Sequence, residues 1–169
     1  MKLAQGEYIA LEKIESTYGT IPAIAQVFVH GDSLQAFVIA VIVPDPVQLA
    51  SIVTEVTGKN VSATDEDALR KACLDERVNR HYLSLCSKAA RKKGLKGYAS
   101  FLCSSMFTYF DLYDRYEFVK RIHLSLDPFT EAENTLTPTM KLRRKDAYQK
   151  FKAELDALYA MGDQNVSKL

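Results

Sequence analysis

The feature that most constrains this chain is a nine-residue segment, Gln35 to Val43, which reads QAFVIAVIV. Eight of its residues are apolar and five of these are β-branched. The segment is far shorter than the roughly 20 apolar residues of a membrane-spanning helix, and no other stretch reaches that length. A short β-branched run without polar alternation is typical of a strand that is buried on both faces. The segment therefore predicts such a strand, which ends at Pro44.

Three further segments carry strand signals. Residues 23–30 (AIAQVFVH) precede the buried strand and are joined to it through a turn at Gly31 and Asp32, which predicts a β-hairpin. Residues 117–126 (EFVKRIHLSL) alternate in character and predict another strand. The opening segment KLAQGEYIAL alternates around Gln5 and Gly6, and predicts a short hairpin at the N-terminus.

Five helices are predicted from apolar spacing and from start and stop signals. They cover residues 11–18, 47–56, 65–74, 76–93 and 144–161. Asp45 and Pro46 suit the N-cap and first position of the second helix, and Thr64 with Asp67 suggests a capping box for the third. These elements predict an α+β fold with an N-terminal β-hairpin, a short and mainly antiparallel sheet of about three strands, and several packed helices.

Charge and motif content narrow the possible functions. The chain carries 22 basic and 21 acidic residues, so its net charge of +1 gives no general attraction to nucleic acid. Phosphate-binding glycine loops, a GxSxG elbow and an HExxH motif are all absent. The cysteines and histidines are scattered without metal-ligand spacing, so no metal site is expected. The residues alone predict a small α+β domain with a lysine on a loop.

The last three residues are Ser167, Lys168 and Leu169. A terminal Ser-Lys-Leu is a peroxisomal address that an import receptor reads on an accessible tail. Residues 162–169 are therefore expected to form a flexible targeting tail, with the import receptor as a partner and the peroxisome as the location. The alternative is an accidental match in a solvated tail.

Three blocks of sequence carry a family resemblance. In order, they read KLAQGEYIALEKIE, QVFVHGDSLQAFVIAVIVPDP and LTPTMKLRRKDAYQKF. Together they resemble the C-terminal lid domain of long-chain acyl-CoA synthetases, which belong to the adenylate-forming, or AMP-binding, superfamily. The resemblance extends from Lys2 to about Met161, and it implies that residues 1–161 form one lid domain.

The resemblance implies a two-step reaction. A fatty acid and ATP give an acyl-adenylate and pyrophosphate, and the thiol of CoA then displaces AMP to give acyl-CoA. In the family, a large N-terminal adenylation domain holds ATP, Mg²⁺ and the fatty acid, and the lid takes a different pose in each step. The chain starts at Met1 without that domain. It is therefore expected to bind none of these ligands alone, to be inactive alone, and to need the adenylation domain as its partner.

The resemblance also assigns candidate site residues. Lys141, in TPTMK, matches the lid lysine, whose long ammonium can bridge the two anions that meet during adenylation. Gly6 matches the glycine of the hairpin that lines the pantetheine tunnel during thioester formation. Glu7 and Tyr8 are weaker CoA-binding candidates, and some relatives have arginine in place of Tyr8. Glu12 and Glu15 belong to the same pattern and are expected to anchor the helix that follows. The alternatives are an exposed lysine in a basic run and an ordinary hairpin glycine.

Residues 98–115 depart from the family pattern. Relatives pass almost directly from a motif like GLKGY to one like EFVKRIHL, whereas here 18 residues, six of them aromatic, separate the two motifs. An insertion of this length matches a short intron, so our hypothesis is a translated, unspliced intron. The alternatives are a genuine insertion that docks on a membrane or partner, and a family-specific loop that packs on the core.

Three function classes remain open at the sequence level. The first is part of a peroxisomal long-chain fatty acid–CoA ligase. The second is a stand-alone, non-catalytic module that uses the same fold to bind CoA or a partner. The third is an RNA-binding domain, suggested only by basic clusters at residues 91–96 and 141–145. The near-zero net charge and the lack of an aromatic RNA-binding strand pattern argue against nucleic acid as a partner.

Overall fold

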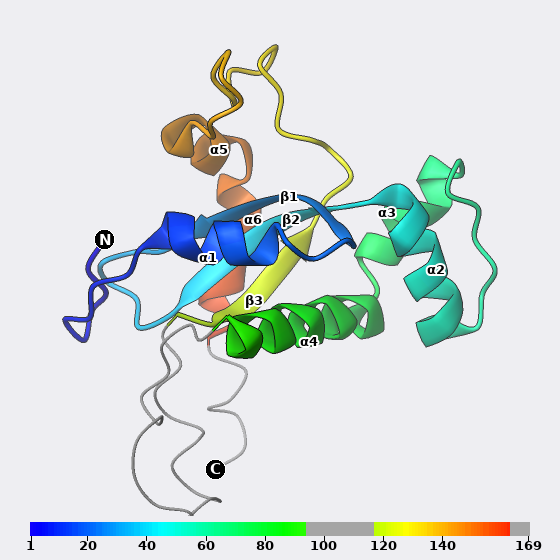
Figure 1. Cartoon of the computed structure of the whole chain (residues 1–169), viewed down its shortest axis with the longest axis horizontal. Helices are drawn as coiled ribbons and strands as arrows, with labels where there is room; N and C mark the ends of the chain where they lie inside the picture. The colour runs from blue at the N-terminus through cyan, green and yellow to red at the C-terminus, as the bar shows by residue number, and fades with distance from the viewer. Residues whose placement is uncertain (94–116, 163–169) are drawn as a thin grey trace, which may run out of the picture.

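The computed structural model describes residues 1–93 and 117–162 (Figure 1). In chain order, its elements are α1 (Leu11–Tyr18), β1 (Ile24–His30), β2 (Val38–Pro44), α2 (Pro46–Thr57), α3 (Glu66–Cys73), α4 (Glu76–Lys92), β3 (Val119–Leu124), α5 (Arg144–Lys150) and α6 (Lys152–Ala160). This content confirms the α+β prediction. The predicted insertion at 98–115 and the targeting residues Ser167, Lys168 and Leu169 lie outside the described residues.

The sheet has the strand order β1-β2-β3, and β2 is buried along its whole length, as its sequence predicts. Strands β1 and β2 pair antiparallel, with His30 opposite Ile39, which confirms the predicted hairpin. Strands β2 and β3 pair in parallel, so the sheet is mixed. The parallel pair arises because the helices between the two strands form a crossover connection, which a parallel pair requires.

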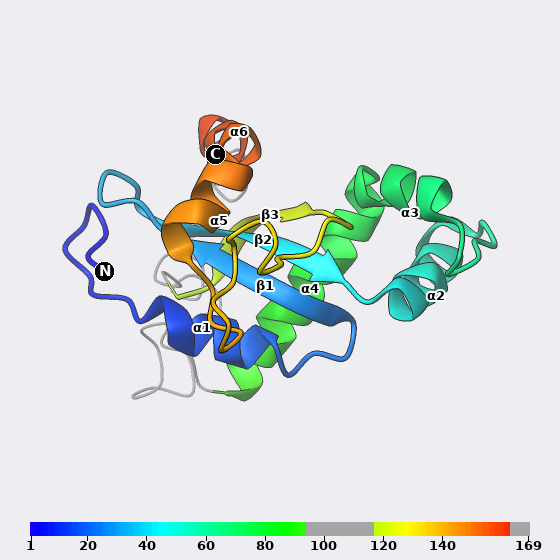
Figure 2. The ribbon, with the colours of Figure 1, turned by 90° about the horizontal axis from the view of Figure 1, so that it is seen from above.

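Alternate residues of β2 supply two separate cores. Val38, Ala40 and Ile42 join the first core, which also takes in buried side chains of α1, α2, α3 and α4. Ile39 and Val41 join the second core, together with buried side chains of α5 and α6. Figure 2 shows α6 on one side of the sheet and α1 with α4 on the other. The strand is therefore apolar throughout because helices cover both of its faces.

The starts of two helices follow from side-chain caps. The carboxylate of Asp45 accepts hydrogen bonds from the backbone amides of Val47 and Gln48, both at 3.0 Å, and so caps α2 as predicted. The predicted cap of α3 is wrong in detail: Asp65, not Thr64, accepts from the amide of Ala68 at 3.0 Å. No helix in residues 1–93 or 117–162 is long and apolar enough to cross a bilayer.

The predicted helix at 144–161 is broken at Phe151, where α5 ends and α6 begins. Phe151 has φ −114° and ψ 26°, outside the helical region. Its ring is buried and packs edge-on against Phe129, with 5.6 Å between ring centroids. The apolar spacing continues through the break, so periodicity alone predicts one helix. The structure has two helices instead, and Phe151 packs into the second core between them.

Candidate functional site

Lys141 lies at the end of a tight hairpin that we define as the Lys141 hairpin, residues 136–142. Leu136 and Leu142 form an antiparallel bridge at its base. The amide of Met140 donates to the carbonyl of Thr137 at 2.8 Å, and the amide of Thr137 donates to the carbonyl of Lys141 at 2.8 Å. The amide of Lys141 also donates to Thr137 Oγ1 at 3.0 Å. Thr137 therefore holds the backbone of Lys141 at two points, through its amide and its hydroxyl, while its carbonyl holds the amide of Met140.

Met140 takes the left-handed backbone conformation, with φ 59°. This geometry is that of a three-residue hairpin loop, in which the third loop residue has positive φ and is usually glycine. The opening hairpin is built in the same way: Gly6 donates to Leu3 at 2.9 Å, Leu3 donates to Glu7 at 2.9 Å, and Gly6 has φ 95°. The two loops therefore share one backbone design, with glycine in one and methionine in the other.

Exchanging the residue type at these two positions is expected to change stability in opposite directions. Met140→Gly should raise the free energy of unfolding by about 0.5–1 kcal/mol, because left-handed strain on a non-glycine residue exceeds the entropy that glycine adds to the unfolded chain. The Met140 side chain is 74% exposed, so little packing is lost. Gly6→Ala should lower it by about 1 kcal/mol through strain alone, since a Cβ would lie 3.8 Å from its nearest neighbour. Urea unfolding of both variants measures this, and a loss of stability in Met140→Gly would contradict it.

Lys141 is exposed, and within the described ranges its ammonium has no hydrogen-bond or ion-pair partner. Arg143 and Lys145 are exposed as well, whereas Arg144 is half-buried and directed inward. The basic run at 141–145 is thus a set of side chains with two different surroundings. Only Arg144 is engaged in the interior, and Lys141 remains available to an external anion.

Arg144 connects the end of the Lys141 hairpin to β1 and α1. Its Nη2 atom lies 2.6 Å from Glu15 Oε2, and its Nη1 atom donates to the carbonyl of Val29 at 3.1 Å. Glu15 Oε1 accepts from the amide of Val29 at 2.9 Å. Burial raises the pKa of the Glu15 carboxyl, although the Val29 amide and Arg144 act in the opposite direction. Glu15 therefore anchors α1, as predicted for it, and also joins α1 to β1 and to Arg144. This pairing spans 129 positions, and no local sequence signal indicates it.

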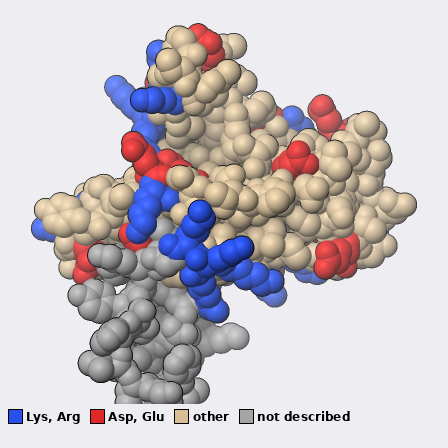
Figure 3. All heavy atoms as spheres, viewed as in Figure 1, with Lys and Arg blue, Asp and Glu red and all other residues tan. Residues whose placement is uncertain are grey.

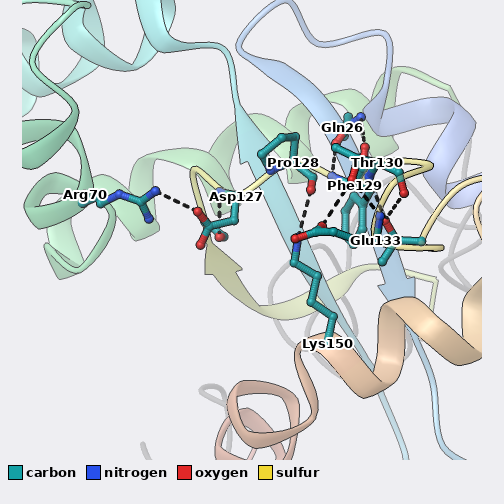
Figure 4. Close-up of polar contacts among 10 residues, drawn as sticks. Gln26, Arg70, Asp127, Pro128, Phe129, Thr130, Glu133 and Lys150 are labelled. Carbon is teal, nitrogen blue, oxygen red and sulfur yellow. Dashed lines mark hydrogen bonds and ion pairs between the residues drawn. The ribbon is translucent and has the colours of Figure 1, made fainter.

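The segment before the Lys141 hairpin is fixed at several points (Figure 4). The side-chain amide of Gln26 donates to the carbonyl of Phe129 at 3.1 Å and accepts from its amide at 2.7 Å. Lys150 donates to the carbonyl of Pro128 at 2.9 Å and lies 2.6 Å from Glu133 Oε2. The segment ends at Thr135, whose carbonyl accepts from the amide of Arg143 at 2.8 Å, at the base of the Lys141 hairpin. The hairpin therefore stands on an ordered base.

The other candidate residues lie on the opening hairpin. Lys2 and Tyr8 form its antiparallel bridge, which confirms the predicted N-terminal hairpin. Tyr8 is 76% exposed, with the ammonium of Lys2 5.8 Å from its ring centroid, while Gly6 and Glu7 are partly buried. In Figure 1 the opening hairpin extends to the left of the sheet, whereas the loops that precede α5 rise above it. Within residues 1–93 and 117–162, no hydrogen bond or ion pair joins this hairpin to the Lys141 hairpin, so the structure does not link Gly6 and Lys141.

Positive charge is unevenly distributed on the face that Figure 3 shows. Lys and Arg side chains gather over the end of α4, where Lys88, Arg91, Lys92 and Lys93 are exposed. This end of α4 is the negative end of its helix dipole, so the charges stabilise the helix whether or not they bind anything. A second group lies beside α5. The described residues include no group of three or more metal-ligating side chains.

Two histidines lie beneath α5 and α6, in contact with the second core. The ring of His30 stacks on Tyr148 at 4.7 Å between centroids, and the ring of His123 lies 5.9 Å from that of Phe151. Burial lowers the pKa of both histidines, against the opposing effect of nearby carboxylates. Both are partly buried, and they lie in β1 and β3, which were predicted as strands.

We expect the free energy of unfolding to fall as the pH is lowered from about 7 to about 5.5. A histidine with a lowered pKa binds its proton more readily in the unfolded chain, so its contribution is complete above its ordinary pKa of 6.5 and is lost below it. Glu15 has a raised pKa, so its protonation at lower pH favours the folded chain and opposes the effect of the histidines. The predicted pH range therefore ends at about 5.5. Urea unfolding across this range should show the slope, and a His30→Gln, His123→Gln double variant should flatten it. An unchanged slope would contradict the assignment.

The chain is similar to known ligases and to a solved adenylation domain. It is 33% identical over 171 residues to the peroxisomal acyl-CoA ligase 891 of Penicillium roqueforti, and 35% identical over 158 residues to long-chain-fatty-acid–CoA ligase 5 of Mus musculus. These matches cover 99% and 94% of the chain. The adenylation domain of the carboxylic acid reductase from Segniliparus rugosus, solved with AMP and a carboxylic acid, superimposes with a TM-score of 0.67 at 27% identity over 95% of the chain. The chain is homologous to one segment of an acyl-CoA synthetase of the AMP-binding superfamily.

This acyl-CoA synthetase segment spans about a fifth of the length of the curated relatives it matches: 22% of the fungal ligase and 20% of the mouse ligase. It also covers 20% of the reductase adenylation domain. No protein-family model matches the chain. The homology supports the family resemblance of the three sequence blocks, and the relatives contain a large portion that has no counterpart in this chain.

Proposed function

We propose that this chain is the lid portion of a long-chain fatty acid–CoA ligase, and that Lys141 is its catalytic residue for acyl-adenylate formation. The observation that carries the proposal is the state of Lys141: an exposed ammonium without a partner in the described part of the chain, on a hairpin with a fixed backbone. Homology to long-chain ligases supplies the reaction. An ordinary surface lysine would need no such fixed support.

The role of Lys141 follows from the charges that meet during adenylation. The fatty-acid carboxylate attacks the α-phosphate of ATP, so two anions approach each other and negative charge builds on the phosphorus oxygens. A preorganised cation at that point stabilises the transition state more than the separated reactants. The lysine side chain is long enough to reach outward from the lid, while the hairpin fixes the position of its Cα. Once pyrophosphate has left, this stabilisation is no longer needed.

The opening hairpin is proposed to act in the second step. Gly6 would let the backbone approach the thiol arm of CoA closely, with Glu7 and Tyr8 beside it. The positive φ of Gly6 already favours glycine for conformational reasons, so both roles are compatible. Lys141 and Gly6 lie on two separate hairpins, which suits a lid that presents a different surface in each step.

The remaining ligands are assigned to a larger adenylation portion. ATP, Mg²⁺ and the fatty acid would be held there, and AMP occupies the solved reductase adenylation domain that resembles this chain. Lys141 fits the phosphate of the nucleotide by charge. The 169-residue chain alone is expected to give no acyl-CoA, since most of the length of its relatives lies in portions that it does not match.

We also propose a peroxisomal location. Ser167, Lys168 and Leu169 form the import signal, and two fungal relatives are named as peroxisomal ligases. A fluorescent protein that carries residues 162–169 should enter peroxisomes, and the same fusion without the last three residues should stay outside them. Equal distribution of the two fusions would contradict the proposal.

The central test is reconstitution. The chain would be mixed with a long-chain ligase from which the matching segment has been deleted, such as mouse ligase 5. Pyrophosphate release measures adenylation, and acyl-CoA formation from preformed acyl-adenylate measures the second step. We expect the chain to raise both rates above those of the deleted ligase alone. Binding of the chain without a rise in either rate would favour the alternative of a non-catalytic, partner-binding module.

A further inference from the structure

One atom of Arg144 and one of Glu15 bond to the free edge of β1. Strand β1 is an edge strand, and the amide and carbonyl of Val29 are bonded to side chains rather than to another strand. Glu15 accepts from the amide, Arg144 donates to the carbonyl, and the two side chains bond to each other at 2.6 Å. We name these three residues the edge clamp. It closes a ring of polar contacts between α1, β1 and the first residue of α5.

The edge clamp is more restrictive than a surface ion pair. The Glu15 side chain is 15% exposed and that of Arg144 is 35% exposed, so water screens the pair only partly. The guanidinium also lies 6.0 Å from the ring centroid of Phe28. A planar guanidinium that donates in two directions and rests on a ring has little freedom to rotate. Lysine at the same position would donate from a single nitrogen and would lose this geometry.

Arg144, the edge-clamp residue that follows the Lys141 hairpin, lies only three residues after Lys141. Between them, the amide of Arg143 donates to the carbonyl of Thr135 at 2.8 Å, and Met140 has its left-handed backbone on the other side. The chain from Met140 to Arg144 is therefore short and is held at both ends. The Thr137 contacts make the hairpin rigid within itself, whereas Arg144 ties its end to β1 and α1, so movement of the hairpin relative to the sheet strains the contacts of Arg144.

We propose that Arg144 is a positioning residue for Lys141, which it holds at a fixed place relative to the sheet by gripping Val29 and Glu15. This inference rests on the proposed function of Lys141 in adenylation. It assigns to Arg144, through Glu15, a share of the rate of the first step without contact with substrate. A purely stabilising ion pair, by contrast, would affect the whole chain evenly and would affect both steps of the reaction alike.

The first measurement uses the full chain alone and follows amide hydrogen exchange. Arg144→Met removes the guanidinium but keeps an unbranched side chain. We expect the amides of Thr137, Lys141 and Arg143 to exchange about tenfold faster or more, through local opening, while amides in α4 change little. The matched control is Arg70→Met, which breaks another arginine–carboxylate pair, with Asp127 at 2.8 Å, away from the hairpin. That variant should leave hairpin exchange unchanged.

The second measurement uses the reconstituted enzyme. Arg144→Met should lower kcat of adenylation about tenfold, with little change in KM for ATP and in the rate of thioester formation, because a misplaced cation costs transition-state stabilisation rather than binding. Glu15→Gln keeps the acceptor for Val29 but loses the charge, and should show the same pattern in weaker form. It also replaces Arg144→Met if that variant fails to fold.

Two results would overturn the inference. One is hairpin exchange no faster in the Arg144 or Glu15 variant than in Arg70→Met. The other is an equal rise in exchange across the hairpin and α4, which would make the edge clamp a general stabilising contact. Failure of the wild-type chain to reconstitute would count against the proposed function instead, because the exchange measurement decides separately whether Arg144 orders the hairpin.

Discussion

Replacing Lys141 with alanine is expected to slow acyl-adenylate formation by about 10²–10³-fold in the reconstituted enzyme. The free energy of unfolding should change by less than about 0.5 kcal/mol, because the side chain is exposed and has no partner in the described ranges. A large kinetic effect without a stability effect identifies a group that acts in the transition state. Single-turnover release of pyrophosphate measures the first quantity, and urea unfolding measures the second.

The same substitution should leave the second step nearly unchanged. Attack of the CoA thiol on a preformed acyl-adenylate no longer brings a carboxylate against the triphosphate, so the stabilisation that Lys141 provides is not required. Lys141→Arg is expected to recover only part of the adenylation rate, since the planar guanidinium places its charge differently from a compact ammonium. Thioester formation from preformed acyl-adenylate therefore serves as an internal control for assembly of the two portions.

Lys145→Ala is the matched control for the charge of the basic run. Lys145 is exposed and positive like Lys141, but it lies in the first turn of α5 and not on the hairpin. Its removal should change the adenylation rate by no more than about twofold, because Lys145 is exposed and its charge is screened by water and salt. If Lys145→Ala were as damaging as Lys141→Ala, the effect would come from the overall field of the run. The alternative of an ordinary basic surface would then be correct.

The fold was largely predictable where local chemistry decides it. The segment from Gln35 to Val43 predicts a strand buried on both faces, and β2 is such a strand. Asp45 followed by Pro46 predicts the start of α2, because capping depends on neighbours in sequence. The parallel pairing of β3 with β2 depends on the route of the helices between them. The break at Phe151 depends on which ring fills the second core. Neither the parallel pairing nor this break is decided by neighbouring residues in sequence.

The candidate site divides in the same way. Lys141 and Gly6 could be named because they stand in motifs with a family resemblance, and their roles stay predictions. The left-handed conformation of Met140 was not predictable, since methionine is not a residue that marks such a turn. The pairing of Arg144 with Glu15 was not predictable either, because it joins residues at opposite ends of the chain. The sequence thus predicts which residue acts, and the structure shows which contacts hold the hairpin that carries it.

The base of the Lys141 hairpin depends on Phe129. Its ring is 1% exposed and packs edge-on against Phe28 and Phe151, with centroid distances of 6.2 Å and 5.6 Å. Its backbone is held on both sides by the amide of Gln26. Phe129 is therefore the residue through which the segment that leads to Thr135 and the hairpin joins the second core.

Phe129→Ala is expected to lower the free energy of unfolding by about 3–5 kcal/mol, through lost burial and the cavity left between β1 and α5. That is a large share of the stability of a domain of this size. Phe129→Leu, which refills much of the volume, should cost less than about 2 kcal/mol. Leu74→Ala serves as the surface control, because Leu74 is 78% exposed and should change stability by less than about 0.5 kcal/mol.

Urea unfolding, followed by circular dichroism, measures all three variants. A cost near that of Leu74→Ala would mean that the second core closes over the missing ring, and that Phe129 does not fix the segment before the hairpin. If the large cost is found, the remaining native fraction of Phe129→Ala should also show faster amide exchange at Thr135 and Arg143 than at residues of α4. The hairpin that presents Lys141 would then depend on the second core as well as on the edge clamp.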